Sequence, residues 1–120
     1  MGEKEQNFGF EVLHVGLNQD NAAEAEKTAQ ILQMLFRFGK RETPISVFST
    51  DRIEIMKQRG AGTLGHIAVG ANDAVAAKKY LETKGVEFDE NSAAYLPDGR
   101  LKLIYIKQEI AGFAFHLLQK

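Results

Sequence analysis

The sequence contains no cysteine, no tryptophan and only two prolines. Without cysteine the chain cannot form a disulfide framework, a thiol nucleophile or a cysteine metal site. Neither sign of charge dominates, because 15 basic residues stand against 16 acidic ones, and this balance argues against nucleic acid as a partner. The apolar runs are too short for a membrane span or a signal peptide. We therefore expect a cytoplasmic protein that binds no membrane and whose chemistry depends on histidine, carboxylates or a bound ion.

The composition predicts one globular domain. Hydrophobic residues make up 44% of the chain and charged residues 26%, which is close to the average of globular proteins. Residues 1–7 are polar and charged, and we expect them to form a flexible arm before a domain over residues 8–120. Glycines mark a linker over residues 58–64, which separates module one (8–57) from module two (65–120).

The hydrophobic pattern predicts helices and strands in both modules. The two predicted helices, Ala22–Phe38 and Ala74–Lys84, each follow a capping asparagine or aspartate and end near a glycine. The predicted strands are Phe8–Leu17, Pro44–Ser49, Arg52–Lys57, His66–Val69, Val86–Asp89, Leu101–Lys107 and Gly112–Leu118. The order is therefore β-α-β-β in module one and β-α-β-β-β in module two.

The two modules resemble each other. The segment His14–Leu17 aligns with His66–Val69, and the capping residues and helix starts that follow stay aligned without a gap. Internal similarity at a fixed offset is the signature of a repeated structural unit. We therefore expect a duplication in which His14 and His66 occupy equivalent positions.

All three histidines of the chain, His14, His66 and His116, fall in predicted strands. Side chains alternate between the two faces of a strand, so His14 is expected to share its face with Val12 and Gly16. The same alternation gives the other two histidines small neighbours, while the opposite faces carry core residues. Small neighbours leave room beside each imidazole for an ion or a ligand.

Glu54 is a fourth candidate, because it alternates with two isoleucines near the end of module one. Three imidazoles and one carboxylate form a donor set that suits Zn, Ni, Fe or Mn. Glu54 is also a possible base. The competing interpretation is structural: a single strand histidine is more often hydrogen-bonded within the fold, and such a glutamate more often faces solvent.

Four residues in the C-terminal part of module two are weaker candidates for substrate binding: Tyr95, Arg100, Lys102 and Tyr105. They would line the mouth of a pocket and attract an anion such as a 2-oxo acid. The alternative, favoured by their position around a Pro-Asp-Gly turn, is that they form the surface of a hairpin.

With these residues the chain resembles the vicinal oxygen chelate superfamily, which includes glyoxalase I, bleomycin-resistance proteins, extradiol dioxygenases, methylmalonyl-CoA epimerase and fosfomycin-resistance proteins. The resemblance is carried by Leu13–Leu17, Arg52–Met56, Gly65–Val69 and Gly112–Gln119. It implies an α+β fold in which two βαβββ modules form an eight-stranded, cup-shaped mixed sheet with two outer helices. It also implies that His14, Glu54 and His66 match the first three metal-ligand positions. The fourth ligand is usually glutamate in the family and is His116 here.

A narrower resemblance runs from Lys84–Asp89 to Phe115–Lys120. It is to a glyoxalase-like domain that is fused to the C-terminus of some 2-keto-3-deoxy-6-phosphogluconate/4-hydroxy-2-oxoglutarate aldolases. A chain of 120 residues cannot contain the aldolase barrel, which needs about 200 residues or more. An aldolase would therefore be a partner and not the activity of this chain.

The sequence leaves three functions open, and with them whether the protein is an enzyme. The first is a lyase or isomerase that acts on a small carbonyl compound or 2-oxo acid through a divalent transition metal. The second is a non-catalytic ligand-binding or accessory domain associated with the aldolase, and the third is a structural dimerisation domain. Small members of this fold commonly dimerise, so we expect a homodimer.

Overall fold

The computed structural model describes residues 7–120, so most of the predicted N-terminal arm lies outside the described residues. Over this range the chain forms two helices and eight strands. In chain order the elements are β1 (Glu11–Leu17), α2 (Ala22–Phe36), β2 (Lys40–Glu42), β3 (Ser46–Ser49), β4 (Ile53–Met56), β5 (Gly65–Ala71), α3 (Ala74–Thr83), β6 (Phe88–Tyr95), β7 (Leu101–Ile106) and β8 (Phe113–Gln119). Neither helix has the length and apolar character that a membrane span requires.

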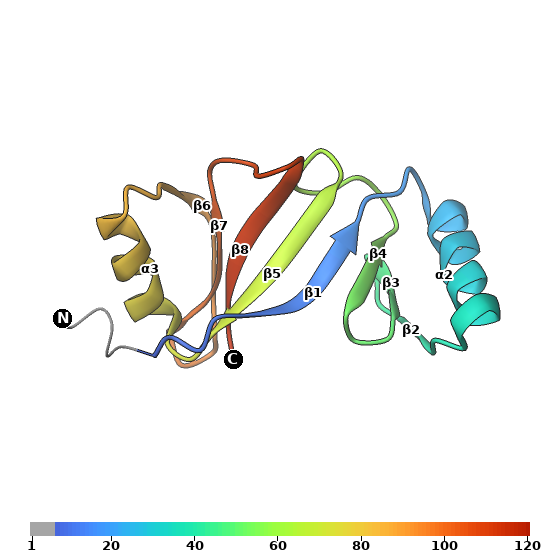
Figure 1. Ribbon diagram of the computed structural model, residues 1–120, viewed down its shortest axis with the longest axis horizontal. Helices are drawn as coiled ribbons and strands as arrows, with labels where there is room; N and C mark the ends of the chain where they lie inside the picture. Colours follow the sequence, from blue (N-terminus) through green and yellow to red (C-terminus); the bar gives the residue numbers. More distant parts are fainter. Residues whose placement is uncertain (1–6) are drawn as a thin grey trace.

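All eight strands belong to one mixed sheet in the order β2-β3-β4-β1-β5-β8-β7-β6. Each module supplies four neighbouring strands, and in each the first strand runs parallel to the last, β1 beside β4 and β5 beside β8. The antiparallel pair β1–β5 joins the modules at the centre of the sheet. Figure 1 shows the two helices at opposite ends, with β1, β5 and β8 between them. The predicted α+β architecture of two βαβββ modules is confirmed.

The shortest strand, β2, is absent from the sequence prediction. Its residues, Lys40–Glu42, are charged and exposed, so they carry no hydrophobic pattern. The strand forms because its backbone pairs with β3 at the edge of the sheet. Helix α2 ends at Phe36, two residues before the predicted end, because Arg37 adopts a left-handed conformation with φ 61° and donates its N–H to Gln33.

Each helix packs on one end of the sheet through alanines. Ala25 and Ala29 of α2 lie with Val47 and Ile55 in one buried cluster. The second cluster lies under α3 and contains Ala71, Ala74, Ala77, Phe88, Leu101, Ile104 and Leu117. Small side chains allow close contact between a helix and a sheet. The face of the sheet opposite the helices is left for polar residues.

Strand β1 contains an irregularity just before His14. Val12 pairs with Val69, whereas His14 pairs with Ala68, so one extra residue stands between these pairs. The extra residue is Leu13, and its side chain lies against Gly70, where a Cβ atom would be only 2.8 Å away. The expectation that Val12 shares the face of His14 is therefore wrong, because the inserted residue reverses the alternation there.

Candidate metal centre

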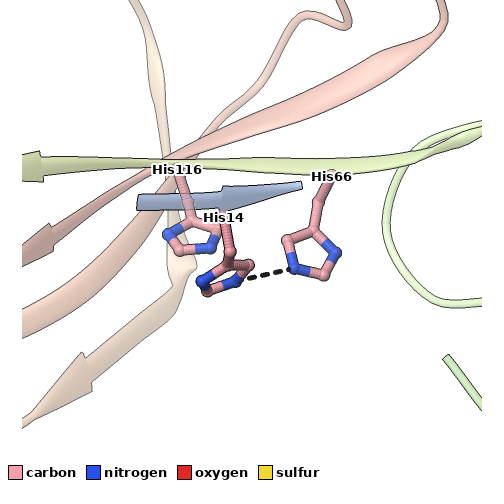
Figure 2. Close-up of side chains that lie close together, drawn as sticks. All are labelled: His14, His66 and His116. Carbon is pink, nitrogen blue, oxygen red and sulfur yellow. Dashed lines mark hydrogen bonds between the residues drawn. The ribbon is translucent and has the colours of Figure 1, made fainter. Parts of the chain in front are cut away.

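The four predicted ligands come from four adjacent strands, β4, β1, β5 and β8. Gly16 pairs with Glu54 on one side and with His66 on the other, so these two side chains flank a glycine. In the next row of the same face, Ala68 pairs with both His14 and His116. The small residues between the ligands let the longer side chains converge over the middle of the sheet, as Figure 2 shows for the three histidines.

Three of the four side chains are in direct contact. His66 Nε2 lies 3.1 Å from Glu54 Oε1 and 3.3 Å from His14 Nε2. The third side of this triangle, from His14 Nε2 to Glu54 Oε1, is 3.4 Å. Ligand atoms at about 2.1 Å from one ion lie about 3.0 Å apart at right angles and about 3.4 Å apart in a tetrahedron. The three atoms therefore already have the mutual spacing of ligands on one metal ion.

His116 completes the group from β8. One ring nitrogen from each of the three histidines lies within 4.8 Å of the others. His116 Nδ1 is 3.1 Å from the Leu117 carbonyl, to which it donates a hydrogen bond, and this leaves Nε2 as the free acceptor. Burial lowers the pKa of His116 to about 4, although the bond to Leu117 acts against this shift. The ring is therefore neutral at pH 7, as a metal ligand must be.

Glu54 is held as a carboxylate in a buried position. Ser46 Oγ donates to its second oxygen, Oε2, at 2.8 Å. Burial raises the pKa of Glu54, but hydrogen bonds with His14, His66 and Ser46 outweigh that effect and hold the pKa well below the usual range. A carboxylate with one oxygen fixed by a serine and the other beside two imidazoles has the orientation that a metal ligand would need.

Gly16 makes the position of His66 possible. A Cβ atom at residue 16 would lie 2.0 Å from one ring carbon of His66 and 2.2 Å from its Nδ1. Real atoms do not approach so closely, so only glycine fits beneath this imidazole. The small neighbour noted in the sequence thus accommodates the histidine ring itself. The aromatic ring of Phe48, 5.6 Å from the His14 ring between centroids, closes the other side of the group.

A cavity of about 480 Å³ lies near the cluster, and none of the four candidate ligands lines it. Two of its lining residues are cross-strand neighbours of candidate ligands, since Ala114 pairs with His66 and Tyr105 pairs with His116. Burial, and to a smaller extent the negative charge of Glu54, raises the pKa of the Tyr105 phenol. The wall of the cavity therefore includes a neutral phenol beside the candidate ligands.

The other predicted substrate residues do not line this cavity. Tyr95 is 63% exposed at the end of β6. Arg100 forms an ion pair with Asp98 in the turn that follows, with Nε 2.8 Å from Oδ2. Lys102 is exposed at an irregularity in the pairing of β6 with β7. Tyr105 is thus the one of the four that the fold places beside the cluster.

Sequence reasoning missed Ser46 and the charged cavity residues Asp89, Lys107 and Glu109. Alternation along β3 places Ser46 on the same face as Phe48, which pairs with Glu54. The sequence could therefore have placed Ser46 on the face of the candidate ligands. Nothing local distinguishes the cavity residues from ordinary surface charges. They become part of one wall only because β6, β7 and the turn before β8 meet there.

No protein-family model matches the sequence, and no curated protein matches it significantly. Several solved structures match the fold. Methylmalonyl-CoA epimerase superimposes with a TM-score of 0.66 at 14% identity, over 95% of this chain and 97% of that one. A variant of the Streptomyces coelicolor epimerase in complex with 2-nitronate-propionyl-CoA superimposes with a TM-score of 0.66 at 14% identity, over 92% of this chain and 94% of that one. A hypothetical protein from Bacillus halodurans C-125 superimposes with a TM-score of 0.64 at 14% identity, over 93% of this chain and 95% of that one. The chain therefore has the same fold as methylmalonyl-CoA epimerase, one of the proteins that the sequence resemblance named.

Proposed function

We propose that this protein holds one divalent transition metal ion, Zn, Ni, Fe or Mn, through His14, Glu54, His66 and His116. The observation that carries this proposal is the triangle of ring nitrogens and carboxylate oxygen with sides of 3.1, 3.3 and 3.4 Å. A donor set of imidazoles and one carboxylate matches these metals in chemistry. Of the reactions that such a centre supports, we infer lyase or isomerase chemistry on a small carbonyl compound or 2-oxo acid.

A bound ion in this position would supply Lewis-acid polarisation of two adjacent substrate oxygens. The chain's own residues prepare the site for it. Ser46 orients the Glu54 carboxylate, and the Leu117 carbonyl fixes the tautomer of His116. Because these partners are already bonded in the folded protein, little reorganisation is needed when ion and substrate arrive.

The similarity of the fold to methylmalonyl-CoA epimerase favours isomerase over lyase chemistry. Their ligands include methylmalonyl-CoA, a large polyanion. In this chain the charged residues at the cavity are Asp89, Glu109 and Lys107, so carboxylates outnumber cations. An excess of carboxylates around a cavity of about 480 Å³ repels a polyanion such as a CoA ester more strongly than a small substrate with a single negative charge.

The test is the metal content of protein purified without added metal or chelator, measured by elemental analysis beside the double variant His14→Ala/His66→Ala. We expect about one equivalent of a transition metal in the parent and none in the double variant. Screening of 2-oxo acids and hemithioacetals would follow. No metal in the parent, even after reconstitution with Zn, Ni, Fe and Mn, would contradict the proposal.

A second function, a binding or accessory domain without a metal, is favoured by one observation. The polar atoms of the cluster already satisfy one another, since His66 contacts both His14 and Glu54, and Ser46 bonds Glu54. Such a network can also be structural. Failure of every metal to bind would favour this function, and the aldolase named by the narrower resemblance would then be the first partner to test.

A further inference from the structure

Tyr105 faces both the ligand cluster and the neighbouring cavity. It pairs with His116 across β7 and β8, and the centroids of the two rings lie 4.8 Å apart. It also lines the cavity together with Ala114, the cross-strand neighbour of His66. The phenol therefore lies at the boundary between the candidate ion site and the space open to a substrate.

The Tyr105 hydroxyl has no partner within residues 7–120. The hydrogen bond of this residue comes from its backbone N–H, which donates to Ser92 Oγ at 2.9 Å. Tyr105 is half-buried, and its hydroxyl is not among the fully buried polar atoms, so it is open to the cavity. An unpaired phenol that lines a cavity beside metal-ligating residues is available to a ligand.

The opposite edge of the cavity is also fixed in place. Asn18 donates through Nδ2 to the Gly62 carbonyl at 2.9 Å, and its Oδ1 accepts from the Gly60 N–H at 3.0 Å. The carboxylate of Glu109 accepts from the N–H and the hydroxyl of Thr63. These bonds hold the segment between the modules against the turn before β8. The side of the cavity opposite Tyr105 is therefore an ordered, hydrogen-bonded segment.

We propose that Tyr105 is a catalytic residue whose hydroxyl donates a hydrogen bond to the substrate oxygen that gains negative charge during the reaction. This inference rests on the proposed function, because an ion held by the cluster would bring that oxygen to the edge of the cavity. Chemistry next to a carbonyl group builds negative charge on oxygen. A donor that is already in position stabilises that charge without reorganisation.

The test compares Tyr105→Phe with Tyr80→Phe, the same chemical change in α3, where Tyr80 packs against Phe8 on the helix side of the sheet. Parent and variants are loaded with Co²⁺, whose visible spectrum reports its ligands, and are titrated with oxalate, a small anion with adjacent oxygens. A hydrogen bond to a charged oxygen corresponds to a change in affinity of about ten- to a hundredfold. We expect Tyr105→Phe to bind Co²⁺ normally and oxalate at least about tenfold more weakly, and Tyr80→Phe to match the parent.

The outcomes separate this inference from the proposed function. Equal oxalate affinity in the parent and Tyr105→Phe, with Co²⁺ bound in both, would overturn the role of Tyr105 and leave the metal site standing. Loss of Co²⁺ from Tyr105→Phe, or failure of the cobalt-loaded parent to bind oxalate, would overturn it as well. A parent that binds no Co²⁺ would overturn the proposed function, and this inference with it.

Discussion

Single residues without charge determine how the ligand cluster is assembled. Gly16 and Ala68 stand between the ligand-bearing strands, and each pairs with candidate ligands on both sides. Any larger side chain there would occupy the space in which the imidazoles meet. The site therefore depends on small residues as much as on the ligands.

The substitution Gly16→Ala is expected to weaken metal binding. Its Cβ would lie 2.0 Å from a ring atom of His66, so the imidazole must move away from Glu54. Gly39→Ala is the matched control, because nothing lies within 4 Å of a Cβ at that position. We expect titration with Zn²⁺ to show at least about tenfold weaker affinity for Gly16→Ala alone. Equal affinities in the two variants would refute the steric role of Gly16.

Two buried serines of β3 offer a second comparison. Ser46 Oγ donates to Glu54, whereas Ser49 Oγ is buried without a hydrogen-bond partner within the described chain. We expect Ser46→Ala to lower metal affinity by about ten- to a hundredfold. Ser49→Ala should leave the metal site unchanged and should not lower the melting temperature, since no bond is lost. Metal titration and thermal unfolding of both variants check this, and a large loss of stability in Ser49→Ala would be inconsistent with its unpaired hydroxyl.

The stability of the metal-free protein should fall with acid because of His116. Its pKa is about 4 in the folded protein against an ordinary value of 6.5. Between these two pH values the imidazole is protonated in the unfolded chain and neutral in the folded protein. From pH 7 to pH 5 this removes about 2 kcal/mol of unfolding free energy. Urea unfolding at both pH values measures the loss. The variant His116→Gln, which cannot titrate, should lose less over the same range, and an equal loss would show that other groups are responsible.

The helices of the two modules begin with the same type of N-cap. Asn21 caps α2 by accepting the N–H of Glu24, and Asp73 caps α3 by accepting the N–H of Ala76. The two caps occupy equivalent positions in the internal alignment. The elements that sequence patterns did not predict, β2 and most of β6, lack such signals. Both lie in the outer part of the sheet, where pairing with a neighbouring strand substitutes for a hydrophobic pattern.

Removal of a cap should affect stability and not the metal site. Asn21→Ala deletes the hydrogen bond to Glu24 at the start of α2, and such a loss costs about 1 kcal/mol. Helix α2 packs on the face of β3 and β4 opposite Ser46 and Glu54, so the ligand geometry should be preserved. Denaturant unfolding and metal titration of one sample test both expectations. Weakened metal binding would mean that the two faces of the sheet are coupled.

At the scale of the whole molecule, the two helices leave the middle of the sheet uncovered on their own side (Figure 1). The strand residues that face this gap, Val15, Ile67, Val69 and Phe115, are only half-buried. A groove of about 280 Å³ runs beside α3 and is lined by Val69, Leu81 and Phe115. The antiparallel pair β1–β5 joins the two similar modules at the centre of the sheet. The two halves of this face are therefore approximately symmetric, and a second copy could pack against both.

We therefore expect a homodimer that covers this face. Sedimentation equilibrium should give twice the chain mass of 13.3 kDa. Phe115→Asp, which places a charge in the apolar middle of the face, should yield a monomer, whereas Asn21→Ala should remain dimeric. A parent that is monomeric at every concentration would contradict the prediction, and a dimeric Phe115→Asp would place the interface elsewhere.

The sequence by itself determined the duplication of the strand–helix unit, the order of every element except β2, both helices with their caps, and the identity of the four polar strand residues. These features depend on local periodicity and on contacts a few residues apart. Only the tertiary structure decided that Glu54 and His66 meet across Gly16, that β1 shifts its register before His14, and that Tyr105 joins a cavity with Asp89 and Glu109. Strand order and register bring together residues far apart in the chain, such as His14 and His116, and no local pattern encodes their contact.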